Sequence, residues 1–202
     1  MAVLTVDSLS AGYGHTNVIS NVSFSLETGL VVGLSGRNGA GKSTLFKAVL
    51  GQLATPFSQI SMDNIPIPKG KRWQIIGHLP QETFLPGSII IEKLPRLFLE
   101  TSAQRNQVEN NLRFQQIAKS RVISLSEGER RFLEILLILA LDRPFFFLDE
   151  PFSRIDPLYV TECRKMILDR SGTAGILVTD HNFIDLKKVS HRRLTLSHGR
   201  IL

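Results

Sequence analysis

Cysteine is almost absent from the sequence: Cys163 is the single thiol among 202 residues. One cysteine cannot close an intramolecular disulfide, so nothing in the composition points to an oxidising compartment. No motif surrounds Cys163, and we therefore assign it no reactive role.

Long uncharged apolar segments are also missing. The most apolar stretch, Phe132 to Leu148, is interrupted by Glu134 and by Asp142. Its longest uncharged run covers residues 135–141, whereas a membrane-spanning helix needs about 20 apolar residues. Residues 1–7 lack the basic and apolar regions of a signal peptide. We therefore expect a soluble chain that is linked to any membrane through a partner.

The composition is otherwise typical of a globular protein. Hydrophobic residues make up 43% of the chain and charged residues 21%, which allows one large domain with a substantial core. The 24 lysines and arginines exceed the 18 acidic residues and give a formal charge of +6. This excess suits an anionic ligand, an acidic membrane surface or nucleic acid without choosing among them.

Hydrophobic patterning predicts an α/β fold. Short apolar runs at 30–34, 145–148 and 175–178 are typical of strands covered on both faces of a parallel sheet. Helical patterns cover residues 42–50 and 126–141, and the second begins with Ser126 and Glu129 at capping-box spacing. The more polar segment 82–124 reads as a small, mostly helical insertion between two strands.

A phosphate-binding loop is the first chemical signal. Residues 36–43 fit the pattern G-x-x-x-x-G-K-[ST] and lie between a predicted strand and a predicted helix. In such a loop, main-chain amides and the helix N-terminus face the phosphates. Lys42 would reach the β- and γ-phosphates, and the Ser43 hydroxyl would bind Mg²⁺. A chance glycine-rich turn is the alternative, and the strand–loop–helix context argues against it.

Two carboxylates end the apolar run at residues 145–148. Asp149 and Glu150 would lie at the carboxyl edge of the sheet, beside the phosphate loop. Asp149 is then a candidate Mg²⁺ ligand and Glu150 a candidate general base for the attacking water. Alone, such a pair would more often be a solvated turn.

Residues 125–130, Leu-Ser-Glu-Gly-Glu-Arg, start a predicted helix. They permit two interpretations. One is an ordinary helix N-cap. The other is a second anion-binding helix terminus, directed at a nucleotide held by another protomer.

Taken in order, these motifs resemble the ATP-binding-cassette (ABC) ATPase family. The phosphate loop, Gln81, the Leu-Ser-x-Gly signature, the Asp149–Glu150 pair and His181 follow one another as in that family. Residues 153–156 look like its D-loop, and residues 198–202 like its closing hairpin. The amino-acid sequences of residues 128–131 and 149–152 look closest to those of ATPases of lipopolysaccharide exporters and branched-chain amino-acid importers.

The resemblance implies one ABC ATPase domain over residues 1–202, with a P-loop NTPase core, an N-terminal antiparallel β element and the helical insertion at 82–124. In this family two subunits pair head-to-tail around two ATP molecules. The implied nucleotide-binding residues are Tyr13 for adenine, then Gly36, Arg37, Asn38, Gly39, Ala40, Gly41, Lys42, Ser43 and Thr44, with Gln81, and with Ser126 and Gly128 acting in trans. The implied metal ligands are Ser43, Gln81 and Asp149, and the implied catalytic residues are Glu150, His181 and Lys42.

Three departures from the family pattern stand out. Glu127 replaces the first glycine of the signature, and we expect its side chain to turn to solvent, because a carboxylate about 5 Å from a phosphate would cost on the order of 3 kcal/mol. Arg37 replaces a small residue inside the loop. The insertion between Gln81 and Leu125 is shorter than in most members.

The leading hypothesis is an ATP-hydrolysing motor subunit, with Mg²⁺ as cofactor, that forms a homo- or heterodimer and binds a transmembrane permease at the cytoplasmic face of the cell membrane. One alternative is a soluble ABC ATPase in nucleic-acid or cluster-assembly work, which the basic clusters at 69–72 and 187–193 keep open. We do not expect nucleic acid as the partner, because such clusters are usually solvated faces. Another alternative, motivated by Glu127, is a nucleotide-sensing subunit with little turnover.

Overall fold

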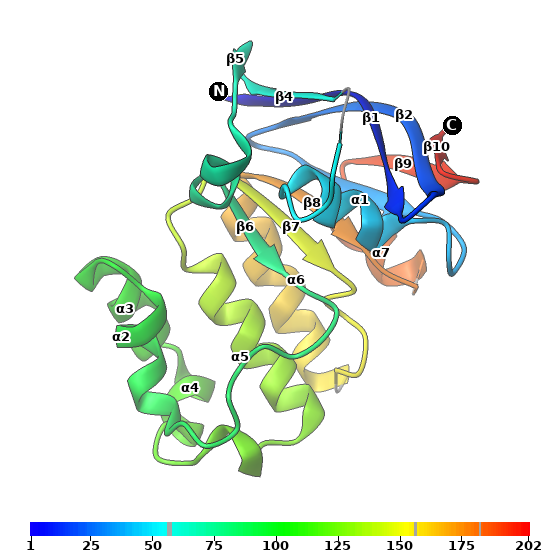
Figure 1. The fold of residues 1–202 in the computed structure, drawn as a ribbon. Helices are drawn as coiled ribbons and strands as arrows, with labels where there is room; N and C mark the ends of the chain where they lie inside the picture. Colours follow the sequence, from blue (N-terminus) through cyan, green and yellow to red (C-terminus); the bar gives the residue numbers. More distant parts are fainter. Residues whose placement is uncertain (56–57, 156, 182) are drawn as a thin grey trace.

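Two β-sheets organise the computed structural model, which describes residues 1–55, 58–155, 157–181 and 183–202 (Figure 1). The strands are β1 (Val3–Tyr13), β2 (Thr16–Glu27), β3 (Val31–Ser35), β4 (Gln59–Met62), β5 (Ile65–Pro66), β6 (Ile76–Leu79), β7 (Phe145–Asp149), β8 (Gly175–Thr179), β9 (Arg192–Ser197) and β10 (Arg200–Ile201). The α-helices are α1 (Lys42–Val49), α2 (Leu94–Phe98), α3 (Ser102–Glu109), α4 (Leu112–Ile117), α5 (Glu127–Leu139), α6 (Pro157–Ser171) and α7 (Phe183–Val189), and short 3-10 turns cover Lys69–Gln74, Ile91–Lys93 and Val122–Ser124.

The larger sheet has the strand order β10-β9-β3-β8-β7-β6. Its strands from β9 to β6 run parallel, and β10 pairs antiparallel with β9 as the closing hairpin. The smaller sheet, β2-β1-β4-β5, is antiparallel throughout. The expected α/β fold, with a mostly parallel sheet and an N-terminal antiparallel element, is confirmed.

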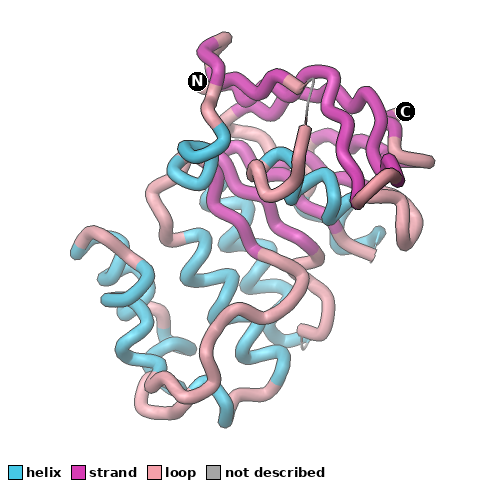
Figure 2. Tube along the Cα trace, in the orientation of Figure 1, coloured by secondary structure: helices cyan, strands magenta, loops and turns pink. Residues whose placement is uncertain are grey.

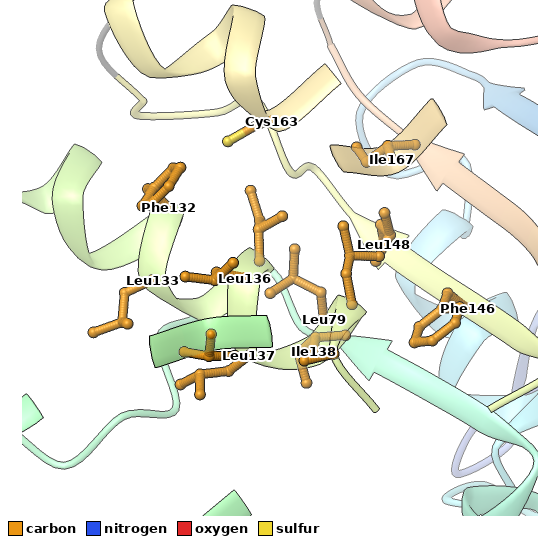
Figure 3. Packing of buried hydrophobic residues seen from close by; sticks show 14 of the residues in the cluster. Leu79, Phe132, Leu133, Leu136, Leu137, Ile138, Phe146, Leu148, Cys163 and Ile167 are labelled. Carbon is orange, nitrogen blue, oxygen red and sulfur yellow. The ribbon is translucent and has the colours of Figure 1, made fainter. Parts of the chain in front are cut away.

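The continuous apolar run in β7 is explained by two separate cores on the two faces of the larger sheet. Phe145 and Phe147 pack into the core shared with α1, β1 and β2. Phe146 and Leu148 point the other way, into the core shared with α5 and α6 (Figure 3). Burying each such side chain contributes roughly 1.5–3 kcal/mol, so a strand covered on both faces needs apolar residues at successive positions.

Helix α5 begins where the capping box predicted. The Ser126 hydroxyl accepts a hydrogen bond from the Glu129 amide at 3.2 Å, and the Glu129 carboxylate accepts one from the Ser126 amide at 2.9 Å. The helix ends at Leu139 rather than at the predicted Leu141. Its last turn tightens, because the Leu141 amide bonds the carbonyl of Ile138, three residues back.

The expected helical insertion lies between the neighbouring strands β6 and β7 and includes α2, α3 and α4. These short helices form a group beside α5, away from the strands (Figure 2). Among the described residues, no helix is long and apolar enough to cross a membrane.

Candidate active site

The phosphate loop joins the end of β3 to the start of α1, as the sequence predicted. Gly41, the N-cap of α1, has a φ of 103°, a left-handed conformation that side chains rarely adopt. At Gly36 a Cβ atom would lie 2.5 Å from the carbonyl oxygen of Leu196 on β9. Both glycines are therefore required by the local backbone, and they allow the loop to lie close to the sheet edge.

A cavity of about 340 Å³ opens on this loop. It is lined by Val18, Asn38, Gly39, Gly41, Lys42, Ser43, Thr44, Gln81, Glu150 and His181. Most of the predicted loop residues therefore share one cavity with the three side chains predicted from distant parts of the chain.

Lys42 is 6% exposed and its ammonium lies against the loop itself. Its Nζ donates to the carbonyl oxygen of Gly36 at 2.9 Å and to that of Arg37 at 3.4 Å. The positive end of the α1 dipole adds to this charge. The arrangement suits an anion such as a phosphate chain.

The Glu150 carboxylate is bound on both oxygens by neighbouring side chains. The Gln81 amide donates to Oε2 at 3.0 Å, and the Ser153 hydroxyl donates to the same atom at 3.3 Å. Nε2 of His181 lies 2.6 Å from Oε1. The Glu150 side chain is only 8% exposed, so these contacts fix its direction at the cavity wall.

Asp149 is buried and is not among the residues that line the cavity. It is 3% exposed, and its Oδ1 accepts a hydrogen bond of 2.6 Å from the Thr179 hydroxyl on the neighbouring strand β8. The sequence interpretation missed Thr179. Its signal was a hydroxyl at the end of the apolar run 175–178, at the same edge of the sheet.

Three predicted magnesium ligands offer oxygen atoms at this edge. Ser43 and Gln81 line the cavity, and Asp149 ends β7 directly before Glu150, which also lines it. Hydroxyl, amide and carboxylate oxygens are the ligand types that Mg²⁺ prefers, usually together with waters and substrate phosphates. The donor set therefore fits this ion.

The signature residues, unlike Gln81, Glu150 and His181, lie away from the phosphate loop of their own chain. Ser126 and Gly128 start α5 and do not line the phosphate-loop cavity. The Glu127 side chain is 65% exposed and pairs with Arg154, with 3.0 Å between Oε1 and Nη1. Its orientation toward solvent agrees with the expectation from the sequence.

Residues 19–153 match the ABC transporter family. The chain belongs to this family. It is an ATP-binding and ATP-hydrolysing subunit of an ABC transporter, and the soluble and nucleotide-sensing alternatives are not favoured.

Similar curated proteins include lipopolysaccharide export ATP-binding subunits. The protein of Acidithiobacillus ferridurans is 34% identical over 99% of this chain and 88% of its own. That of Escherichia coli K12 is 32% identical over 100% of this chain and 90% of its own. An ATP-binding subunit of an ABC transporter superposes with a TM-score of 0.89 at 26% identity, covering 98% of this chain and 88% of its own.

Some ABC residues predicted from the sequence lie outside the phosphate-loop cavity. Tyr13 ends β1 and is 51% exposed. Gly36, Arg37 and Ala40 line a neighbouring cavity against the β9–β10 hairpin. The last residue of the predicted D-loop, Asp156, lies outside the described residues.

A buried charge pair on α5 was not assigned from the sequence. Arg131 and Glu134 line a cavity of about 460 Å³ that shares Gln81, Glu150 and His181 with the phosphate-loop cavity. The available signal was the charge itself, since Glu134 interrupts an otherwise apolar helix stretch. The role of the pair Arg131–Glu134 depends on contacts that become visible only in the folded structure.

Proposed function

We propose that this ABC ATPase hydrolyses ATP at the phosphate-loop cavity, with Glu150 as the general base. Lys42 and the loop amides of residues 36–44 would bind the phosphates. Glu150 would polarise the attacking water, and His181 would contact the γ-phosphate and help to position that water. The observation that carries this proposal is the meeting of Gln81, Glu150 and His181 beside Lys42 in one cavity.

Mg²⁺ is part of the proposal. When bound, this ion supplies electrostatic stabilisation of charge on the phosphates. Ser43 and Gln81 would hold it from the cavity side, and Asp149 directly or through water. Thr179 keeps the Asp149 carboxylate oriented by its 2.6 Å hydrogen bond.

We further propose that the site is completed by a second subunit. Ser126 and Gly128 start α5 outside the cavity of their own chain, where they are available to another protomer's nucleotide. Tyr13, exposed at the end of β1, would stack on adenine. The domain would then act as a head-to-tail dimer with two ATP molecules between its halves.

The permease would dock on the helical insertion at the cytoplasmic face of the membrane. Three large apolar side chains of the insertion are exposed: Leu97 at 64%, Leu112 at 74% and Ile123 at 70%. Exposed apolar side chains on one small subdomain support a protein partner there. Gln81, directly before the insertion, would connect that partner to the site.

The test is a comparison of Glu150→Gln with Lys42→Ala. Removing the base should lower phosphate release by at least a hundredfold while ATP binding persists, and the variant should elute as an ATP-bound dimer on a sizing column. Removing the ammonium should abolish ATP binding. Glu109→Gln, a remote carboxylate on α3, is the matched control and should behave as wild type. Unchanged hydrolysis by Glu150→Gln would overturn the base assignment.

A further inference from the structure

The buried pair Arg131–Glu134 contacts both segments that carry the hydrolytic side chains. Arg131 is 6% exposed and Glu134 1%, and Nη1 of the arginine lies 3.2 Å from Oε2 of the glutamate. Both residues belong to α5. Burial lowers the pKa of Arg131, while the charge of Glu134 raises it.

The arginine binds the backbone of the catalytic turn after β7. Its Nη2 donates to the carbonyl oxygen of Asp149 at 2.5 Å and to that of Glu150 at 3.1 Å. Glu150 has a φ of 50°, a conformation that costs a non-glycine residue about 1–3 kcal/mol unless its surroundings impose it. On the other side of the same residue, the amide donates to the carbonyl and hydroxyl oxygens of Thr179 at 3.0 and 3.1 Å. Arg131 and Thr179 thus fix the strained peptide from opposite sides.

The same pair binds the segment around Gln81. Nη1 of Arg131 donates to the carbonyl oxygen of Pro80 at 2.7 Å, immediately before Gln81. Oε1 of Glu134 accepts from the Thr83 hydroxyl at 2.5 Å and from the Phe84 amide at 3.1 Å, shortly after it. The two segments fixed in this way carry Gln81 and Glu150, whose side chains meet at 3.0 Å.

Stability alone does not account for an ion pair at this place. Taking two charges out of water costs several kcal/mol per ion, and a well-packed apolar pair of similar volume is often at least as stable. The residues around it are apolar: Phe132, Leu133 and Ile135 on the same helix are at most 1% exposed. What the ionic pair adds is directional hydrogen bonding to four backbone groups and one hydroxyl.

We propose that Arg131, supported by Glu134, is a positioning residue for ATP hydrolysis, which fixes the backbones of Glu150 and Gln81 and links them to α5. This inference rests on the proposed role of Glu150. The N-terminus of α5 carries Ser126 and Gly128, proposed to meet the partner subunit's nucleotide, and Arg131 follows about one turn later. One helix therefore connects the surface facing the partner with the base of its own subunit.

The test uses Arg131→Lys in the full chain. A lysine keeps the charge, but its compact ammonium cannot reproduce the planar fork that reaches Glu134 and three carbonyl oxygens. We expect kcat to fall ten- to a hundredfold while the half-saturating ATP concentration stays within about twofold, because Lys42 and the loop are untouched. Glu134→Gln gives a second variant with the same shape and is expected to shift kcat in the same direction.

Arg170→Lys is the matched control. Arg170 on α6 is less buried than Arg131, but it too donates to two carbonyl oxygens, those of Leu141 at 2.9 Å and Arg143 at 3.2 Å. Within the described part of the chain, its hydrogen bonds are to residues away from the site. It should lose thermal stability without the selective loss of kcat. An equal loss of kcat in Arg170→Lys would show that the effect is only structural and would overturn the proposal.

A double-mutant cycle separates this inference from the proposed function. In single-turnover hydrolysis, Arg131→Lys should cause little further loss in the Glu150→Gln background, since it acts through Glu150. A full multiplicative loss there, or wild-type kcat in folded Arg131→Lys and Glu134→Gln, would overturn the positioning role. Wild-type hydrolysis by Glu150→Gln alone would instead overturn the base assignment.

Discussion

At Glu150 the chain adopts a left-handed backbone directly after the buried strand β7. Its amide, its carbonyl and both carboxylate oxygens contact groups from β8, α5, the segment at Gln81 and His181. A residue held from so many directions has little freedom to reorient. The consequence is a carboxylate whose position is fixed by the fold itself, as electrostatic preorganisation requires.

The pair Glu127–Arg154 offers a test of charge compensation at the residue scale. Both side chains are largely exposed, so the pair contributes at most about 1 kcal/mol to the fold. In the proposed dimer, however, loss of Arg154 would leave the Glu127 carboxylate as an uncompensated negative charge near the partner's ATP. We predict that Arg154→Ala raises the ATP concentration for half-maximal dimerisation roughly three- to tenfold, measured in the Glu150→Gln background by light scattering.

The combined variant Glu127→Gly with Arg154→Ala should restore the wild-type ATP dependence. The melting temperatures of these variants should agree closely, because the pair is exposed. If the double variant is as impaired as Arg154→Ala alone, Arg154 acts in some way other than by neutralising Glu127.

His78 on β6 lies edge-on to the ring of Phe46, with 6.2 Å between ring centroids. Burial lowers its pKa from 6.5 to about 4; Asp149 opposes this shift, while Arg131 and Lys47 add to it. The folded protein therefore keeps this imidazole neutral. Above pH 6.5 the histidine is neutral in the unfolded chain as well, so its burial adds no pH dependence to the free energy of unfolding.

As the pH falls from 6.5 toward 4, the unfolded chain binds a proton at His78 that the folded chain does not. We predict that this lowers the free energy of unfolding by up to about 3 kcal/mol. His78→Phe should flatten this part of the profile in urea titrations without nucleotide or magnesium. The exposed His15, changed to Gln, should leave the wild-type profile intact.

The residues that the sequence predicted correctly to share a cavity are those in local patterns. Lys42 and Ser43 follow a fixed spacing, and Glu150 directly follows a recognisable strand. Arg131 and Thr179 could not be assigned in this way, because only the folded chain brings them to their partners. For Arg131 these are mainly main-chain carbonyl oxygens, and for Thr179 they are the Asp149 carboxylate and the Glu150 amide. A side chain that binds a main-chain carbonyl leaves no residue type in the sequence to match it.

At the scale of elements, α5 is the most informative helix. Its start was predicted from the capping box, and its apolar face packs against β6, β7 and α6 (Figure 3). The sequence could not show that α5 also carries a polar face inside the molecule. The group of short helices α2 to α4 was predicted only as a mostly helical segment, since helices of five to eight residues give weak periodicity.

Packing between α5 and α6 gives a prediction about stability. Phe132 is 1% exposed, and its ring centroid lies 5.3 Å from that of Tyr159. Phe132→Ala should lower the free energy of unfolding by about 3–5 kcal/mol, which corresponds to a fall in melting temperature on the order of 10 °C. Differential scanning calorimetry measures this, with the exposed Leu112→Ala as control. A shift below about 1 kcal/mol would show that the two helices repack around the missing ring.

At the scale of the whole molecule, the proposed coupling to a permease can be tested without disturbing the site. Leu97→Asp and Leu112→Asp change exposed side chains of the insertion, so stability and basal ATP hydrolysis should stay near wild type. We predict that the pair of changes lowers co-purification with the permease from detergent-solubilised membranes severalfold. Ile65→Asp, at an equally exposed position on β5, should not. If the double variant Leu97→Asp with Leu112→Asp recovers as much permease as Ile65→Asp does, the permease docks elsewhere.

The insertion leaves the larger sheet at the end of β6 and the chain returns to it in β7, the adjacent strand. The hydrogen bonds between the paired strands β6 and β7 therefore do not depend on the length of the chain that connects these strands. The segment proposed to bind a membrane partner could then be exchanged while the hydrolytic residues stay as they are. A chimaera that receives residues 85–124 from another ATPase, with the Thr83–Glu134 contact kept, should inherit the donor's choice of transporter and the recipient's chemistry.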